Sequence, residues 1–338
     1  MPDHHMMGPF VRRFLLEELV ADRNLSLNTQ KSYRDAIRLL FGFLAERYST
    51  DPSRVTVEQV DATVVRGFLG YLESDRGNSI STRNQRLAAL HSLFRFIGRL
   101  VPELIDHAAQ IKAIPLRRTA TPVMPYLDKH EIDALLAIPD HHRAQGRRDY
   151  ALLLFLYNTG ARATEAAQVT VADLSLGASP SARFDGKGRK IRTCPLWPHT
   201  AKILRDLLGA RLDSPRESPV FLNVRGQPIT RHGVHALVAR TVDKAAETVP
   251  SLRDKRVSPH TIRHTTAVHL LRAGVDINTI RAWLGHASLE TTNRYAEVDL
   301  EMKAKALKTC AVTGPNPATK HTPNWHRDNG LMSFLASL

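Results

Sequence analysis

Apolar residues recur at helical spacing along the first hundred residues of the chain. Two segments, 28–48 and 81–100, each place these residues on a single helical stripe. The stripes consist of Tyr33, Ile37, Leu40, Phe41 and Leu44 in the first segment and of Leu87, Leu90, Phe94 and Ile97 in the second. Ser81 or Thr82 is the expected N-cap of the second helix, because a hydroxyl there can accept a free backbone N–H. We therefore expect only helices from about residue 10 to residue 105.

Helical periodicity stops between residues 106 and 125, where the chain contains three prolines and two arginines. This composition predicts a linker. Beyond it, Asp128 is the expected cap of a helix in "DKHEIDALLAIP". A strongly apolar helix follows in "RRDYALLLFLYNTGARATEAAQV", and Gly160 is expected to separate it from a second, short helix.

The periodicity changes between residues 182 and 196. Short alternating runs, "ARF" and "KIRTCPL", flank Gly186, Lys187 and Gly188, which predicts a β-hairpin with a glycine-rich, positively charged turn. Helical patterns return from "TAKILRDLLGARL" through "EMKAKALK". A polar, proline-bearing segment follows, and the chain given ends in "LMSFLASL", which could form a short amphipathic helix.

These elements predict a mainly α fold with a small β-sheet (α+β). We expect a helical domain at 1–105, a linker at 106–125, a second domain at 126–310 and a flexible tail at 311–338. A chain of 338 residues with 43% hydrophobic content can bury two cores. Two domains joined in this way could close around a duplex as a clamp, although shape alone does not establish function.

The charge balance indicates the kind of partner. Lys and Arg number 47 against 33 Asp and Glu, a formal net charge of +14. A globular protein this basic usually binds a polyanion, most often nucleic acid. A ribosome-associated protein and a membrane-surface protein remain the alternatives from composition alone.

The cysteines and the lengths of the apolar runs indicate the cellular location. Cys194 and Cys310 lie far apart with no C-x-x-C pattern, which argues against a disulfide framework and a structural zinc site. No apolar run is long enough for a transmembrane helix, and the N-terminal segment lacks the uninterrupted core of a signal peptide. We expect a cytoplasmic, nucleoid-associated protein.

The stretch "SPHTIRHTTAVHLL" is the strongest candidate for chemistry. Ser258 is a good N-cap and Pro259 suits the first helical position, so His260 and Arg263 share one face near the positive end of a helix. That end favours anions, and a histidine and a guanidinium there make a phosphate site. The alternative is a metal held by His260 and His264. It needs a further ligand, and the positive charge of the adjacent Arg263 disfavours a bound cation. A structural role for His264 stays open.

Four further residues are weak candidates when each is taken alone. Arg162 follows a turn at a helix start, where Glu165 could orient its guanidinium. Lys187 lies between two glycines, where most lysines are simply solvated. His286 follows a glycine break, and Tyr295 lies nine residues later, where a half-buried packing tyrosine is the ordinary outcome.

Taken together, the motifs "TGARATE", "GKGRKIRTCPL", "SPHTIRHTTAVHLL", "LGH" and "NRYAEV" resemble, in order and spacing, those of the tyrosine recombinase (phage integrase) family. The resemblance covers about residues 126–300, and the helical N-terminal region resembles the family's core-binding, SAM-like domain. It implies a two-domain, C-shaped DNA clamp with a tyrosine recombinase catalytic domain. Cys194 departs from the family pattern, which usually has an aliphatic residue there, and we expect it to serve packing only.

The resemblance implies a role for each matching residue. They are Arg162, Lys187, His260, Arg263, His286 and Tyr295. In the family's mechanism the tyrosine attacks a DNA phosphodiester and forms a 3′-phosphotyrosyl link, so neither ATP, a metal nor another cofactor is needed. The two arginines bind the phosphate, the lysine protonates the departing 5′-oxygen, and His260 accepts the tyrosine proton or hydrogen-bonds the phosphate. His286 resembles the second hydrogen-bonding histidine.

The resemblance also implies partners. Double-stranded DNA is the expected substrate, with Arg83 and Arg86 on a basic helix edge and Arg189 and Lys190 in the hairpin turn as candidate contacts. The alternative for such charges is a solvent-exposed helix face or turn with no binding role. A homo-tetramer on paired sites is expected for recombination, with sister recombinases or accessory DNA-bending proteins as further partners. The tail could dock on a neighbouring protomer or be disordered.

Three activities are compatible with these motifs. The first is a site-specific recombinase or integrase, including one that transposes a mobile element. The second is a type IB topoisomerase, which shares the arginine, lysine, histidine and tyrosine set, although the helical domain and the "LGH" motif favour a recombinase. The third is a non-catalytic DNA-binding protein of the same fold, against which the six intact positions argue.

Overall fold

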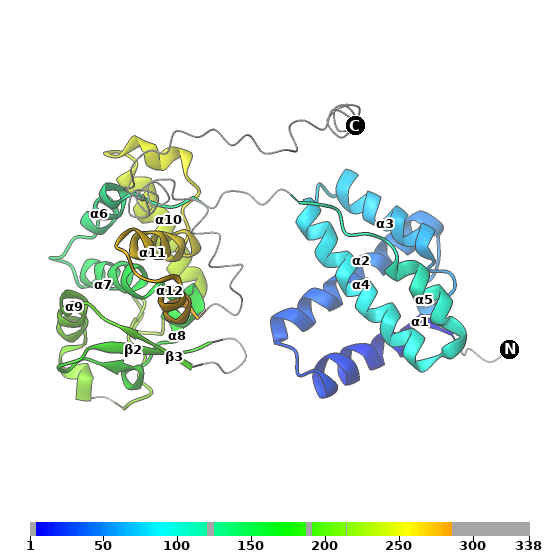
Figure 1. The fold of residues 1–338 in the computed structure, drawn as a ribbon, viewed down its shortest axis with the longest axis horizontal. Helices are drawn as coiled ribbons and strands as arrows, with labels where there is room; N and C mark the ends of the chain where they lie inside the picture. The colour runs from blue at the N-terminus through cyan, green and yellow to red at the C-terminus, as the bar shows by residue number, and fades with distance from the viewer. Residues whose placement is uncertain (1–4, 120–124, 187–190, 214, 286–338) are drawn as a thin grey trace, which may run out of the picture. The chain divides into compact units, whose positions relative to one another are not determined.

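The computed structural model describes residues 5–119, 125–186, 191–213 and 215–285. It divides into two compact units, Met1–Pro122 and Val123–Leu338 (Figure 1). Each unit has its own apolar core. The predicted fold class, mainly helical with one small sheet, is confirmed.

The N-terminal unit is entirely helical in its described part. Its α- and π-helical elements are α1 (Met7–Arg13), the π-helical η1 (Phe14–Asp22), α2 (Leu27–Tyr48), α3 (Ala62–Ser74), α4 (Ile80–Leu100) and α5 (Ile105–Lys112), with 3-10 turns η2 (Pro52–Arg54) and η3 (Pro102–Leu104). The two predicted stripes lie on α2 and α4. Every predicted stripe residue of α4 is buried in the shared core, and Ile37, Leu40 and Leu44 of α2 join it.

Two sequence predictions for this unit are wrong in detail. Helix α4 is capped by Ser79, whose hydroxyl accepts the Thr82 N–H at 3.3 Å, so the helix begins before the predicted Ser81 or Thr82. The predicted linker begins too early, because α5 occupies its first residues and packs on α4. Ala108 and Ile111 are buried there, and their three-residue spacing is the helical signal that the later prolines obscured.

The C-terminal unit is helical around one small sheet. Its helices are α6 (Lys129–Ala137), α7 (Ala144–Thr159), α8 (Ala163–Gln168), α9 (Pro198–Leu208), α10 (Arg231–Ala245), α11 (Pro259–Arg272) and α12 (Ile277–Leu284), with 3-10 turns η4 (Val171–Asp173), η5 (Gly209–Asp213) and η6 (Pro250–Asp254). Helix α7 is buried on all sides from Ala151 to Thr159 and packs against α9 and α11. This explains its continuous apolar sequence.

The predicted hairpin forms the larger part of the sheet. Strands β2 (Ser181–Asp185) and β3 (Ile191–Pro195) pair antiparallel, with Ala182 opposite Cys194. A two-residue strand, β1 (Leu174–Ser175), extends the sheet to the order β1-β2-β3 and was not predicted, because two residues carry no detectable alternation. Strand β3 also contacts α12, which brings the hairpin beside the end of that helix.

Candidate active site

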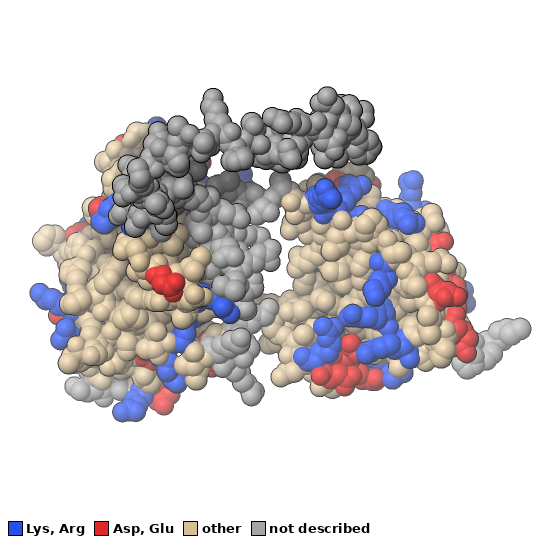
Figure 2. Space-filling view, viewed as in Figure 1, with Lys and Arg blue, Asp and Glu red and all other residues tan. Residues whose placement is uncertain are grey.

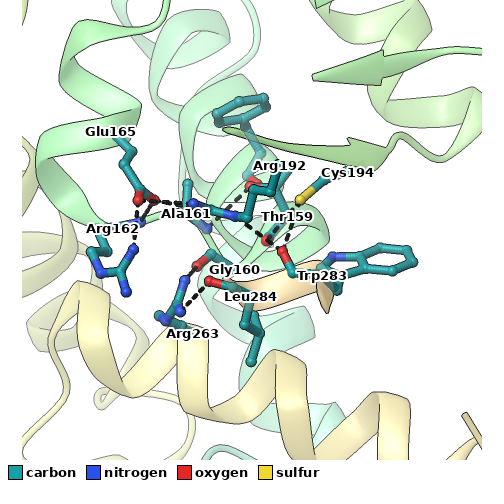
Figure 3. A network of polar contacts seen from close by, with 11 residues as sticks. Thr159, Gly160, Ala161, Arg162, Glu165, Arg192, Cys194, Arg263, Trp283 and Leu284 are labelled. Carbon is teal, nitrogen blue, oxygen red and sulfur yellow. Dashed lines mark hydrogen bonds and ion pairs between the residues drawn. The ribbon is translucent and has the colours of Figure 1, made fainter. Parts of the chain in front are cut away.

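A polar network joins four segments of the C-terminal unit: the turn between α7 and α8, strand β3, helix α11 and the end of α12 (Figure 3). Arg162 is the N-cap of α8, where its own N–H is held by Glu165 Oε2 at 2.7 Å. Its Nη1 donates to Glu165 Oε1 at 2.7 Å, and 39% of its side chain stays exposed. The predicted orientation of Arg162 by Glu165 is confirmed.

Glu165 is shared with a second arginine that the sequence analysis did not single out. Arg192 of β3 donates from Nη1 to Glu165 Oε1 at 2.9 Å and from Nη2 to Glu165 Oε2 at 2.7 Å. In Figure 3 the two guanidinium groups approach the carboxylate from different sides. Burial alone would raise the pKa of Glu165, but the hydrogen bonds and charge of Arg192, together with the hydrogen bonds of Arg162, outweigh it and lower this pKa to about 2. Glu165 is therefore a carboxylate at any physiological pH.

Arg192 ties this pair to the end of α12. Its Nε donates to the Trp283 carbonyl at 3.0 Å, and its guanidinium lies over the Phe184 ring, 4.5 Å from the centroid. Cys194, two residues along β3, donates its thiol to the same carbonyl. Burial raises the pKa of this thiol to about 11, so Cys194 stays protonated and serves packing, as the sequence analysis expected.

Arg263 is held from α11 by two backbone carbonyls. Nη1 donates to Gly160 at 2.6 Å and Nη2 donates to Leu284 at 2.5 Å (Figure 3). The predicted start of its helix is confirmed, because Ser258 caps α11 with its hydroxyl accepting the Thr261 N–H and Pro259 is the first helical residue. The side chain is only 1% exposed, so its orientation is fixed by contacts on the protein side.

Two glycines permit the close approach of these segments. Gly160 ends α7 at φ +59°, and a Cβ there would lie 2.5 Å from Leu284 Cδ2. Gly285 ends α12 at φ +64°, and its Cβ would lie 2.9 Å from Arg192 Cδ. Both positions combine a left-handed backbone with a close contact, which explains the glycines at both predicted helix breaks.

His260 lies in the first turn of α11 and is exposed. Although the side chain reaches solvent, the surrounding protein atoms partly desolvate its imidazole and lower the pKa, and the positive charges of Arg263 and Arg162 lower it further. The structure therefore brings together three of the predicted site residues, Arg162, His260 and Arg263. A neutral imidazole beside two guanidinium groups can accept a proton while the arginines hold an anion.

The other histidines of α11 lie elsewhere. His264 is 1% exposed and its ring is 6.4 Å from that of Tyr126, whereas His260 is exposed, so the two do not form an open chelating pair. His269 pairs its Nδ1 with the Tyr157 hydroxyl at 2.7 Å, which confirms its packing role. Within the described ranges, no group of three potential ligands could hold a metal ion, and no helix has the length and apolarity to cross a membrane.

Several predicted residues lie outside the described part of the chain. They are Lys187, Arg189, Lys190, His286 and Tyr295, together with the tail at 311–338. Their roles stay predictions.

The two DNA-contact candidates on α4 are described, and one does not lie where the sequence predicted. Arg83 is not on an exposed basic edge: it is 6% exposed, with its Nε 3.3 Å from Glu73 Oε1 and its Nη1 3.3 Å from the Pro115 carbonyl. Helical phase directs it toward α3 and the chain after α5, where the acidic partner offsets the cost of burial. Arg86 is half-buried and donates to the Ser32 carbonyl at 3.2 Å. DNA contact by these two side chains stays a prediction.

The sequence did carry a signal for Arg192. Strand β3 alternates exposed and buried residues, and Arg192 occupies a buried position together with Cys194. A charged residue in the inward phase of a strand needs a buried counter-charge, and only the fold reveals that this is Glu165.

Comparison with known proteins gives matches along both units. The profile described as "Phage integrase family" matches residues 125–302, and "Phage integrase, N-terminal SAM-like domain" matches residues 12–99. A Sinorhizobium fredii protein with the provisional name integrase/recombinase y4rC is 38% identical over 100% of both chains. The tyrosine recombinase XerC of Pelobacter propionicus is 34% identical over 86% of this chain and 91% of its own.

Solved structures with the same fold include two DNA complexes. One is the XerH site-specific recombinase bound to palindromic difH substrate, with a TM-score of 0.65, 21% identity, and 85% of this chain and 81% of that chain covered. The other is the Tn1549 transposon integrase with transposon right end DNA, with a TM-score of 0.67, 17% identity, and 89% and 99% covered. At these identities the likeness shows the fold.

Proposed function

The chain belongs to the phage integrase (tyrosine recombinase) family, and from this premise we propose that it is a site-specific DNA recombinase that cuts and rejoins duplex DNA through a 3′-phosphotyrosyl intermediate. The observation that carries the proposal is the convergence of Arg162, Arg263 and His260 at the start of α11. Relatives named as integrases and recombinases, together with the N-terminal SAM-like match, support this activity over topoisomerase-like relaxation.

The chemistry assigns one job to each side chain. The Tyr295 hydroxyl attacks the phosphorus and passes its proton to neutral His260, a new phosphorus–oxygen bond to tyrosine forms, and the bond to the 5′-oxygen breaks. Lys187 gives that oxygen a proton, so it leaves as a hydroxyl. A 5′-hydroxyl from another duplex reverses the step and joins recombinant strands.

Arg162 and Arg263 stabilise the charge that develops on the non-bridging phosphate oxygens, with His286 as a further hydrogen-bonding group. A planar guanidinium matches two oxygens at once, which a lysine ammonium does not. Both arginines are oriented by protein acceptors, Glu165 for Arg162 and the Gly160 and Leu284 carbonyls for Arg263, so little reorganisation is needed when a phosphate arrives.

The proposed partner is double-stranded DNA, bound by both units as a clamp and by four protomers on two paired sites. The net charge of +14 supports a polyanionic partner. Lys and Arg side chains gather in clusters on the viewed face of the N-terminal unit, with acidic side chains beside them (Figure 2). Sister recombinases, accessory DNA-bending proteins, a mobile element as the genetic context and a nucleoid location belong to the same proposal.

The test is covalent trapping on a nicked duplex. The DNA flanking the gene supplies the candidate site, and a nick next to the scissile phosphate lets the 5′-hydroxyl fragment diffuse away. The wild-type protein is expected to accumulate a covalent DNA complex that resists denaturant, and Tyr295→Phe is expected to give none. Equal trapping by the two proteins would contradict the proposal, as would relaxation of a supercoiled plasmid that lacks the site.

A further inference from the structure

We propose that Arg192 is a positioning residue for the cleavage reaction, which neutralises Glu165 so that Arg162 keeps its positive charge and its open donors for the DNA phosphate. This inference rests on the proposed function. It concerns a residue of β3 whose three guanidinium nitrogens all donate to protein acceptors, the Glu165 carboxylate and the Trp283 carbonyl.

The hydrogen-bond geometry is the first argument. Arg192 binds both oxygens of Glu165, while Arg162 uses only Nη1 of its side chain on the same carboxylate. A guanidinium has five N–H donors, and among the described residues the Arg162 side chain donates only to Glu165, so most of these donors are available to a ligand. If Arg192 were absent, both carboxylate oxygens could close on Arg162 as a bidentate pair and draw it away from a phosphate.

The local charge is the second argument. Arg162 and Glu165 alone would form a neutral pair, which attracts a phosphate weakly. With Arg192 the three groups carry one net positive charge, and Arg263 adds another nearby. Because Glu165 is 8% exposed, solvent screens its charge poorly and a buried counter-charge is needed.

The position of Arg192 is the third argument. The same guanidinium is fixed by the Trp283 carbonyl and the Phe184 ring, and Gly285 leaves room for its Cδ. The hairpin strand and the end of α12 therefore hold Arg192 in one place, and through it they fix Glu165 and Arg162. Small displacements at a phosphoryl-transfer site change rates strongly.

The test compares single-turnover cleavage rates at saturating DNA for three variants. Arg192→Met is expected to cleave about 100-fold more slowly, and Arg192→Lys, which restores the charge without the bidentate fork, about tenfold more slowly. The double variant Arg192→Met/Glu165→Gln is expected to regain at least tenfold over Arg192→Met, since no carboxylate is left to neutralise Arg162. The dissociation constant for DNA is expected to change less than about twofold, because one phosphate contact is a small part of duplex binding.

Arg183→Met is the matched control. Arg183 lies on the neighbouring strand β2 and pairs with Asp173 at 3.2 Å. Its side chain is 56% exposed, and its ion pair includes no residue of the Arg162, Glu165 and Arg192 network. This variant is expected to cleave at the wild-type rate. Thermal melting of each variant fixes a temperature at which all are folded. If Arg192→Met does not fold, the double variant is compared directly with the wild type. It leaves no unpaired carboxylate buried at position 165, and its cleavage rate is expected to lie within about tenfold of the wild-type rate.

Wild-type cleavage by Arg192→Met, or a double variant no faster than Arg192→Met, would overturn the inference. So would a double variant more than about 100-fold slower than the wild type where the single variant is unfolded. A wild-type protein that forms no covalent DNA complex would overturn the proposed function instead, so the two failures are distinguishable.

Discussion

One carboxylate, Glu165, organises two guanidinium groups in the candidate site. It accepts one hydrogen bond from the Arg162 guanidinium and one from the Arg162 backbone N–H, and it binds the Arg192 guanidinium through both oxygens. Since its pKa is lowered from 4.5 to about 2, its ionised form stabilises the fold above pH 4.5, and that contribution is lost as the pH falls toward 2. At neutral pH the arginines therefore keep their partner, and the site keeps its geometry.

Replacing Arg162 separates catalysis from binding. Arg162→Lys is expected to lower the cleavage rate by ~10²–10³-fold, because an ammonium cannot bind two phosphate oxygens as a guanidinium does. DNA affinity is expected to stay near the wild-type value, because the summed contacts to the duplex dominate it. Single-turnover cleavage and gel-shift titration measure the two quantities. A collapse of DNA binding together with cleavage would show that Arg162 has a different role.

The ionisation of His260 reports on the charge around it. Arg162→Gln is expected to raise the pKa of His260 toward its ordinary value of 6.5, because one of the positive charges that lower it is removed. Histidine NMR titration measures the shift directly, with Arg183→Gln as the control. An unchanged pKa would mean that Arg162 does not lie near His260.

The pKa of His260 also sets the pH below which the cleavage rate falls. His260 accepts a proton only when neutral, so the cleavage rate is expected to fall as the pH drops through its pKa, which lies below 6.5. In Arg162→Gln the pH below which the cleavage rate falls is expected to rise together with the pKa of His260 measured by NMR.

At the scale of the elements, the site depends on turns that let α7, α11, α12 and β3 meet. Ser258 and Asp128, the predicted caps of α11 and α6, are confirmed, as are the breaks at Gly160 and Gly285. These were readable from sequence because caps and left-handed glycines are local. Strand β1, the start of α4 and the existence of α5 were missed or misplaced, because their signals were too short or too close to prolines.

Gly160→Ala tests the close approach of these elements. The substitution is expected to lower the free energy of unfolding by roughly 1–3 kcal/mol, because φ is +59° and the new Cβ would lie 2.5 Å from Leu284 Cδ2. Chemical denaturation measures the change. Gly177→Ala is the control, since a Cβ there meets nothing within 4 Å and φ is not positive. Equal stability of the two variants would contradict the packing described here.

At the scale of the whole molecule, the sequence predicted the fold class, the family and the clustering of Arg162, His260 and Arg263. It did not predict that Arg83 is buried against Glu73, or that Arg192 shares Glu165 with Arg162. Each pairing joins residues of two different elements, α3 with α4 and α8 with β3, and no local pattern identifies the partner of a buried charge. The sequence motifs thus located the site, but the ion pairs that support its arginines could be identified only from the three-dimensional structure.

The basic character of the chain predicts the salt dependence of DNA binding. If 6–10 phosphates are contacted, affinity is expected to fall by ~10³–10⁵-fold between 50 and 200 mM salt, because bound counterions are released. Fluorescence anisotropy with duplex DNA at several salt concentrations measures the slope. A flat response would contradict DNA binding through many phosphate contacts.

The central claim is that Tyr295 becomes covalently joined to DNA. The most direct measurement is mass spectrometry of the trapped complex after nuclease and protease digestion. We predict that the nucleotide-bearing peptide spans Tyr295, with the phosphate on the tyrosine oxygen and linked to a 3′-oxygen of DNA. A DNA link at any other residue, or a phosphate attached through a 5′-oxygen, would contradict it.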